Sequence, residues 1–222
     1  AACASGGAAV HQAILGLHAY DPVLVLGIER LSGVTGSQLT RNIGMAGDAF
    51  LDQSAGLTFP ANYALVAQRH MQAYGTTMRD LELVSLKNHE NANLNPKAHF
   101  HHKQVTQADI DAGATVSTPL RLFDCCPVSD GAAAVVLSSS PLDRRSIPVL
   151  GSAVISDVIS LVQRETHVSF PAAVEAARLA YSQAGILASD INLAEVHDCF
   201  TIAEIVAMED LGLAEPGAAV EL

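Results

Sequence analysis

Two cysteine-containing segments of this 222-residue chain carry the residue types that acyl transfer through a thioester requires. The first places Cys3 among small residues and glycines, directly before a run of helix-forming residues. The second is His197-Asp198-Cys199-Phe200, which precedes another apolar helical stretch. A helix N-terminus presents unpaired N–H groups and a positive dipole end, which favour a thiolate. A nucleophilic thiolate, a second cysteine and a histidine suffice for thioester formation and for proton transfer at carbon.

Each of these residues also has a purely structural interpretation. A cysteine among Ala, Ser and Gly is often a small core residue, and an isolated histidine often serves packing. Cys125 and Cys126 are interpreted as structural, because nothing near them in the sequence resembles a base. His99, His101 and His102 are interpreted as a solvated cluster rather than metal ligands, since no acidic or cysteine partner set accompanies them. The pattern Gly-x-Ser-x-Gly is absent, so a serine hydrolase is unsupported.

Composition limits the class of protein. Half of the residues are hydrophobic and 16% are charged, with no Trp, which favours an α/β layered fold with a core of Ala, Val, Leu and Ile. The net charge of −11 without a Lys/Arg run makes nucleic acid a poor partner. The four cysteines match no zinc spacing and no signal peptide is present, so we expect free thiols in a reducing cytoplasm. No apolar run approaches the roughly 20 residues that span a bilayer.

Basic residues gather in one segment, where they could bind an anionic cofactor. The alternative is that they are ordinary solvated charges. These residues are Arg69, Arg79, Lys87, Lys97, Lys103 and Arg121.

Hydrophobic periodicity and turn residues predict the elements that position these motifs. Helices are expected at 3–19, 59–74, from Thr77 to about Leu86, from Ser169 to Tyr181, and from Thr201 to Leu211. Near-continuous apolar runs that are typical of buried strands occur at 23–28, 132–137, 148–155 and, more briefly, 191–196. Residues 30–58 lack a clean period and are expected to form a loop with short helices.

Local signals set the expected helix ends. The helix at 59–74 has a proline in its first turn and a glycine after its last residue. The Asn-rich stretch 88–96 is expected to lie outside a helix, because asparagine is a poor helix former. Thr201 and Glu204 have the spacing of a capping box. A cysteine elbow followed by a helix occurs at both cysteine segments, which indicates two related halves.

Four motifs, in order along the chain, resemble those of thiolases. Ala2-Cys3-Ala4-Ser5-Gly6 looks like the nucleophile motif, and residues 124–134 resemble the segment that leads the central strand. His197-Asp198-Cys199-Phe200 is similar to the third motif of sterol-carrier-protein-type thiolases and their prokaryotic relatives. Residues 88–96 resemble the loop region of this subgroup. The resemblance covers essentially the whole chain.

The resemblance implies a layered fold of two related α/β halves with an inserted loop domain. Residues 1–32 and 121–147 would belong to the N-terminal half, and 148–222 would begin the C-terminal half. Residues 33–120 would form the loop domain and bind the coenzyme A moiety. Coenzyme A and acyl-CoA are implied as substrates, with no metal and no permanently bound cofactor. The parent protein would be a homodimer or homotetramer, or part of a larger acyl-CoA complex.

The resemblance also implies roles for three residues. Cys3 would be acylated by acyl-CoA, and His197 would hold the oxyanion of the enolate-forming substrate, directly or through water. Cys199 would be the acid/base cysteine. The Gly-His-Pro motif, whose histidine activates the nucleophile in the family, does not occur in the 222 residues, nor does the final Cys-x-Gly turn. We therefore expect a fragment of a longer thiolase that is inactive by itself.

Two other interpretations stay open. Ketoacyl synthases and hydroxymethylglutaryl-CoA synthases also acylate a cysteine on this elbow, although the motif at His197 favours a thiolase. A non-catalytic, thiolase-like scaffold subunit is the second alternative, and in that case Cys3 would be inert toward alkylation. Acyl chain length and the direction of the reaction are not predicted by the sequence.

Overall fold

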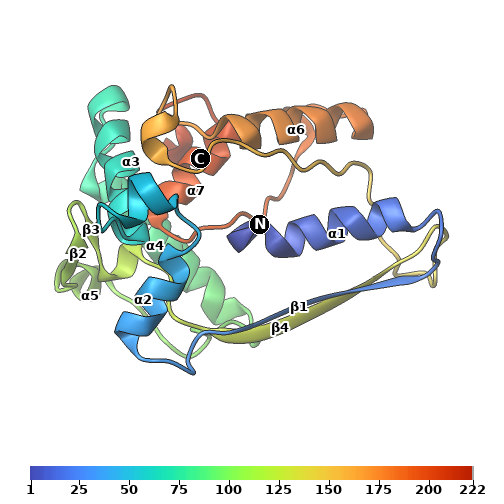
Figure 1. Ribbon diagram of the computed structural model, residues 1–222, viewed down its shortest axis with the longest axis horizontal. Coiled ribbons are helices and arrows are strands. Elements are labelled where there is room, and N and C mark those ends of the chain that lie inside the picture. Colours follow the sequence, from blue (N-terminus) through green and yellow to red (C-terminus); the bar gives the residue numbers. More distant parts are fainter. Residues whose placement is uncertain (222) are drawn as a thin grey trace.

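The computed structural model describes residues 1–221, in which a cluster of helices carries a long two-stranded sheet and helix α1 on one side (Figure 1). The helices are α1 (Ser5–Gly16), α2 (Gly36–Gly44), α3 (Phe59–Tyr74), α4 (Met78–Leu94), α5 (Gln107–Asp111), α6 (Pro171–Ala184) and α7 (Thr201–Asp210). The strands are β1 (Val23–Arg30), β2 (Thr115–Ser117), β3 (Leu120–Arg121) and β4 (Asp130–Leu137). None of the helices among residues 1–221 has both the length and the apolar character needed to cross a membrane.

The ends of α3 confirm the local signals in the sequence. Thr58 caps the helix, and its side chain accepts a hydrogen bond from the Ala61 N–H. Pro60 lies in the first turn, where its missing N–H is not needed. Gly75 ends the helix with φ 78°, a left-handed conformation that a residue with Cβ avoids. The predicted helix at 59–74 is therefore confirmed at both ends.

Helix α4 is longer than the sequence predicts. It begins after Thr77 as expected, but it runs to Leu94 instead of ending near Leu86. Asparagine weakens helices when its side chain competes for nearby backbone groups in non-helical conformations. Here Asn93 donates to a carbonyl one turn earlier, and Asn88 donates to carboxylates of another segment. The Asn-rich stretch is thus helical because its side chains have partners that leave the helix intact.

The long sheet consists of β1 and β4 paired antiparallel, with Val23 opposite Leu137 and Arg30 opposite Asp130. Both strands were predicted and are confirmed. Their expected burial on both faces is wrong for the described residues, since Leu24 is 59% and Ile28 is 74% exposed. Helix α1 packs against β1, and within β1 only Val25 is buried.

The strands predicted at 148–155 and 191–196 are wrong, because both segments are irregular in the structure. A strand is stabilised by a ladder with a neighbouring strand, and these segments pair with none of residues 1–221. The first segment instead lies against α6, where the Ser152 N–H donates to Gln183 Oε1 at 2.9 Å. The α/β class is therefore confirmed in part: the described residues hold two small sheets, not two complete α/β halves.

Gly151 brings this irregular segment close to α6, and we expect Gly151→Ala to destabilise the fold. A Cβ at this position would lie 2.2 Å from the Ala180 carbonyl oxygen, so the two backbones would have to separate. Overpacking of this kind costs about 1–3 kcal/mol. Urea unfolding would measure the loss, with Gly27→Ala as the control, because no atom lies within 4 Å of a Cβ at Gly27. Equal unfolding midpoints for the two variants would contradict the close approach.

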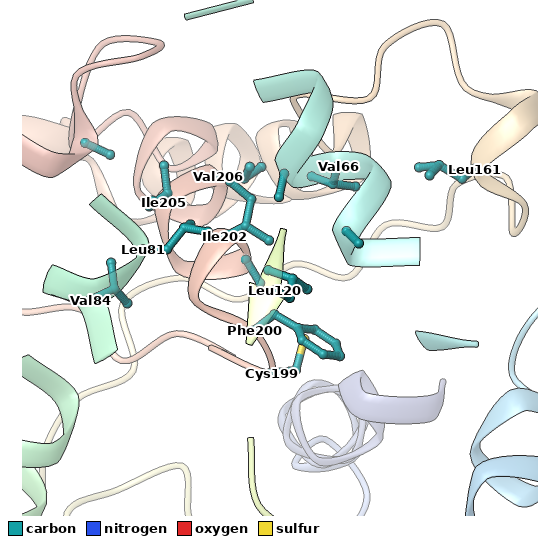
Figure 2. Packing of buried hydrophobic residues seen from close by; sticks show 14 residues of the cluster. Val66, Leu81, Val84, Leu120, Leu161, Cys199, Phe200, Ile202, Ile205 and Val206 are labelled. Carbon is teal, nitrogen blue, oxygen red and sulfur yellow. The ribbon is translucent and has the colours of Figure 1, made fainter. Parts of the chain in front are cut away.

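The core is centred on α7, which packs against α3, α4 and α6 (Figure 2). Ile202, Ile205 and Val206 of this helix are at most 2% exposed. Buried residues of the neighbouring elements surround them: Ala64, Val66, Ala67, Leu81, Val84 and Leu120. Helix α7 is thus the most completely buried helix of this cluster. Because it directly follows the second cysteine elbow, its packing holds the elbow at the edge of the core.

Leu81 is a direct test of this core. Its side chain is fully buried on α4, whereas Leu94 at the end of the same helix is 82% exposed. We expect Leu81→Ala to lower the free energy of unfolding by about 2–5 kcal/mol, because it removes apolar contacts and leaves a cavity. Leu94→Ala is the matched control and should change it by less than about 0.5 kcal/mol. Similar losses in the two variants, measured by urea unfolding, would contradict the assigned core.

Candidate active site

The first cysteine segment places Cys3 at the N-terminal end of α1. Cys3 lies in a 3₁₀ turn, Ala2–Ala4, that leads directly into the 12-residue helix. The turn is closed by Ser5 Oγ, which donates to the Ala2 carbonyl oxygen at 2.7 Å. Cys3 is exposed. The predicted position of this thiol, beside the N–H groups at a helix start, is therefore confirmed.

The second cysteine segment is held by backbone contacts with residues 125–126. The Cys126 N–H donates to the Cys199 carbonyl oxygen at 3.0 Å, and Cys125 pairs with Phe200 in an antiparallel bridge. Cys199 is 8% exposed and Phe200 is 5% exposed, so the elbow enters the core just before α7 begins. The two neighbouring cysteines thus support Cys199 through their backbone.

The capping box predicted for Thr201 and Glu204 is wrong. Thr201 Oγ1 instead donates to Asp124 Oδ1 at 3.0 Å, which ties the start of α7 to the turn before residue 125. Glu204 faces α4, where Lys87 Nζ lies 2.5 Å from one carboxylate oxygen and Asn88 donates to the other at 2.7 Å. Both side chains therefore have tertiary partners that the local spacing does not reveal.

Helix α4 also reaches the elbow itself. Asn88 Nδ2 donates to Asp198 Oδ2 at 2.8 Å in addition to its bond with Glu204. Asp198 lies between His197 and Cys199 in the chain, so this amide fixes the loop that carries both side chains. The Asn-rich motif was singled out in the sequence, but its contact with the second elbow was not foreseen.

The two cysteine elbows meet at His197. A hydrogen bond with His197 lowers the pKa of the Cys3 thiol below its usual value, against the opposing effect of burial. Hydrogen bonds with Cys199 and then with Cys3 raise the pKa of His197 to about 10. Near neutral pH His197 is therefore an imidazolium, which favours the thiolate form of Cys3. Figure 2 shows Cys199 at the edge of the buried cluster, on the side of α1. The structure brings together the three predicted site residues, Cys3, His197 and Cys199.

The pKa values of the other two cysteines are raised, whereas that of Cys3 is lowered. Burial, followed by the nearby Cys199, raises the pKa of Cys126 to about 11. Burial and then Asp124 raise the pKa of Cys125 to about 12. Both remain thiols near neutral pH and are poor nucleophiles. Their position beside the site was not predicted, because nothing in the sequence indicates that this turn pairs with the second elbow.

Tyr63 of α3 is a site neighbour that sequence reasoning missed. Its ring stacks on Phe200 with centroids 4.7 Å apart and packs against the buried cluster that contains Cys199. A tyrosine at helical spacing among apolar residues is typical of ordinary core packing. No feature of the sequence distinguishes this tyrosine from such a residue.

The histidine-rich stretch and the basic segment have other contacts. His99 hydrogen-bonds to Ser129 at 2.8 Å, and the rings of His101 and His102 lie 4.5 Å apart. No group of three His, Cys, Asp or Glu side chains suited to a metal ion occurs among the described residues. Of the six basic residues, Arg79 and Arg121 pair with Glu82 and Lys87 with Glu204, which favours a structural role for these three.

Known proteins resemble this chain over nearly its whole length. Residues 153–222 match a family model described as thiolase C-terminal domain-like. An acetyl-CoA acetyltransferase of Methanothermobacter thermautotrophicus is 43% identical over 98% of this chain and 57% of its own length. Human sterol carrier protein 2 is 29% identical over 99% of this chain and 43% of its own length. The solved Ltp2-ChsH2(DUF35) aldolase superposes with a TM-score of 0.81 at 29% identity, over 97% of this chain and 59% of that one. The chain thus spans about half the length of these relatives.

Proposed function

The chain belongs to the thiolase family, in the branch of the sterol-carrier-protein-type and archaeal enzymes, and we propose that its site transfers acyl groups from coenzyme A through a thioester on Cys3. The observation that carries this proposal is the pairing of Cys3 with His197 at the start of α1. That pairing lowers the pKa of the Cys3 thiol and so favours its thiolate. The substrates proposed are acyl-CoA and 3-ketoacyl-CoA.

In the degradative direction, the Cys3 thiolate attacks the 3-keto carbon of the substrate. The bond between the second and third carbons then breaks, and its electron pair forms the enolate of acetyl-CoA. The enolate oxygen is held by the His197 N–H, and the enolate carbon takes a proton from the Cys199 thiol. The acyl group remains on Cys3 until coenzyme A, whose thiol gives its proton to the Cys199 thiolate, attacks the thioester carbon and displaces the Cys3 thiolate. This sequence uses the three residues that meet at the elbows.

In the condensing direction the same steps run backward. Cys199 as thiolate takes a proton from the methyl carbon of acetyl-CoA, and the resulting carbanion attacks the acyl-Cys3 thioester. His197 again faces the developing negative oxygen. Because the same residues carry out each step in both directions, the concentrations of substrates and products determine whether cleavage or condensation proceeds.

The test is acetoacetyl-CoA cleavage together with a search for acetylated Cys3 by mass spectrometry. It is performed on the 222-residue chain and on any longer polypeptide that contains it, since a fragment is expected to be inactive alone. Formation of acetyl-CoA and an acetyl group on Cys3 would support the proposal. Decarboxylation of a malonyl substrate would indicate a ketoacyl synthase. Unreactive Cys3 in the intact protein would indicate a scaffold subunit.

Assembly and the coenzyme A region complete the proposal. Residues 33–120 are proposed to bind the coenzyme A moiety, and the protein is proposed to form a homodimer or homotetramer. Because the solved neighbour is named as an Ltp2-ChsH2(DUF35) aldolase, a DUF35 protein is also a candidate partner. Co-purification from the native source followed by light scattering would identify which of these assemblies exists.

A further inference from the structure

Asn88 of α4 is bound to the second cysteine elbow through its side-chain amide. Its Nδ2 donates to Asp198 Oδ2 at 2.8 Å and to Glu204 Oε2 at 2.7 Å. A side-chain NH2 group carries two protons, so these two carboxylates use both of its donors. Hydrogen bonds to carboxylates are stronger than those between neutral groups. One amide therefore joins the residue before Cys199 to the first turn of α7.

Helix α4 fixes the place from which this amide reaches the elbow. Leu81, Val84 and Ser85 are buried one to two turns earlier on the helix. Asn88 follows at a spacing that continues the same face. Ser85 Oγ also donates to the Phe123 carbonyl oxygen at 2.9 Å, and α4 packs against α7. The helix therefore holds Asn88 at one height beside the start of α7.

The chain that enters the elbow has few other anchors. No backbone group of residues 193–197 forms a hydrogen bond with another residue among 1–221. After Asp198, the Cys126 N–H donates to the Cys199 carbonyl oxygen at 3.0 Å. The bond between Asn88 and Asp198 is thus the first one that ties this segment to a helix.

The charges at this point require a neutral donor. Asp198 and Glu204 lie within 2.8 Å of the same nitrogen atom, so two acidic side chains converge there. Lys87 Nζ lies 2.5 Å from the other oxygen of Glu204 and balances that carboxylate. Asp198 is bound by the Asn88 amide instead. A carboxylate in place of this amide would bring three like charges together, which is unfavourable.

We propose that Asn88 is a positioning residue, which holds Asp198 and thereby fixes the residues on either side of it. These two residues are His197 and Cys199, and this inference rests on the proposed function. Because Asp198 lies directly between them in the chain, a displacement of its backbone moves both. The reaction needs the histidine at the developing negative oxygen and the cysteine at the carbon that exchanges a proton. A misplacement of about 1 Å can cost about 10²-fold in rate.

The first test is amide hydrogen exchange of Cys126, measured by NMR in Asn88→Ala. This N–H bonds to the Cys199 carbonyl oxygen, so its exchange reports on detachment of the elbow. We expect exchange to be about 10- to 100-fold faster, the range for losing a hydrogen bond to a charged group. Asn91→Ala is the matched control, because Asn91 lies one turn further along the same helix and is exposed. Wild-type exchange of Cys126 in Asn88→Ala would overturn the inference.

Alkylation of Cys3 gives a readout that a purely structural role would not change. His197 lowers the pKa of Cys3, so a displaced imidazolium should raise the pH of half-maximal alkylation in Asn88→Ala. Lys87→Met removes a partner of Glu204 alone and should leave that pH unchanged. An equal shift in both variants would mean that Asn88 acts only through the stability of α7, and the inference would fail.

An exchange of the two side chains keeps the test valid if Asn88→Ala does not fold. Asn88→Asp places a third carboxylate beside Asp198 and Glu204, so we expect a larger shift of the Cys3 profile. When Asp198→Asn is added, the amide at position 198 can donate to the carboxylate at position 88. The profile should then return to that of Asp198→Asn alone. Simple addition of the two single effects would contradict a direct bond between the positions.

Failure of this inference can be distinguished from failure of the proposed function. Hydrogen exchange and alkylation need no substrate, so they test Asn88 even if Cys3 is never acylated. In a longer polypeptide that cleaves acetoacetyl-CoA, Asn88→Ala should lower kcat by about 10- to 100-fold and leave KM nearly unchanged. A loss confined to KM would contradict positioning at the elbow. Absence of cleavage and of acylation in the wild-type polypeptide would reject the proposed function and leave the exchange result standing.

Discussion

Replacing Cys3 with serine is expected to eliminate acylation of residue 3 and, in a longer polypeptide that contains this chain, to lower acetoacetyl-CoA cleavage by at least about 10³-fold, as loss of a nucleophile does. The hydrogen bond with His197 stabilises a thiolate at this position, because the pKa of Cys3 is lowered. A serine hydroxyl does not ionise near neutral pH, so the ion pair with His197 cannot form. Mass spectrometry after incubation with acetyl-CoA would measure the acyl group directly.

Cys126→Ser is the matched control for this substitution. Cys126 lies near the same site, but burial raises its pKa to about 11, so it is a thiol near neutral pH. Its side chain can change while its backbone N–H still donates to Cys199. We expect this variant to retain acylation of Cys3. Acylation that persists in Cys3→Ser and disappears in Cys126→Ser would overturn the assignment of the nucleophile.

The sequence predicts helix boundaries well where neighbouring residues determine them. The helix α3 starts with a threonine cap and a proline, and it stops at Gly75, whose φ of 78° needs a residue without Cβ. All of these signals act within one turn of the helix. The predicted boundaries were therefore confirmed, and the start of α1 beside Cys3 was predicted for the same reason.

The wrong predictions concern segments whose structure depends on contacts with residues far away in the chain. The strand expected at 148–155 needs a partner strand, but its backbone instead meets α6, with Ser152 donating to Gln183. Helix α4 runs through its Asn-rich end because Asn88 finds Asp198, which is 110 residues away. No local pattern contains either contact, so neither result could be read from the sequence.

The residues of the candidate site also fall into those that local sequence predicts and those that only tertiary packing reveals. Cys3, His197 and Cys199 were identified from motifs, because a helix start and a short elbow need particular residues in a particular order. Tyr63 reaches the same place from α3 through packing on Phe200, and its spacing resembles that of any core aromatic. The residues with chemical motifs were predictable, whereas the one that reaches the site through packing was not.

Replacing His197 with asparagine is expected to change both the reactivity of Cys3 and the rate of catalysis. His197 has a pKa of about 10, raised by its hydrogen bonds with Cys199 and Cys3, so it is an imidazolium throughout the neutral range. This imidazolium lowers the pKa of Cys3, and the ion pair between them is lost at about pH 10, where His197 loses its charge. Asparagine keeps a donor of similar reach but carries no charge.

In His197→Asn the pH of half-maximal Cys3 alkylation should therefore rise toward the ordinary thiol value of 9.0. The kcat for acetoacetyl-CoA cleavage should fall by about 10²- to 10³-fold, the usual cost of losing one donor to a developing oxyanion. His18→Asn is a control, because His18 lies beyond the C-terminal end of α1, at the opposite end from Cys3. If the Cys3 profile stayed at its wild-type pH in His197→Asn, the helix N-terminus alone would account for the reactive thiol, and His197 would act only on the second substrate.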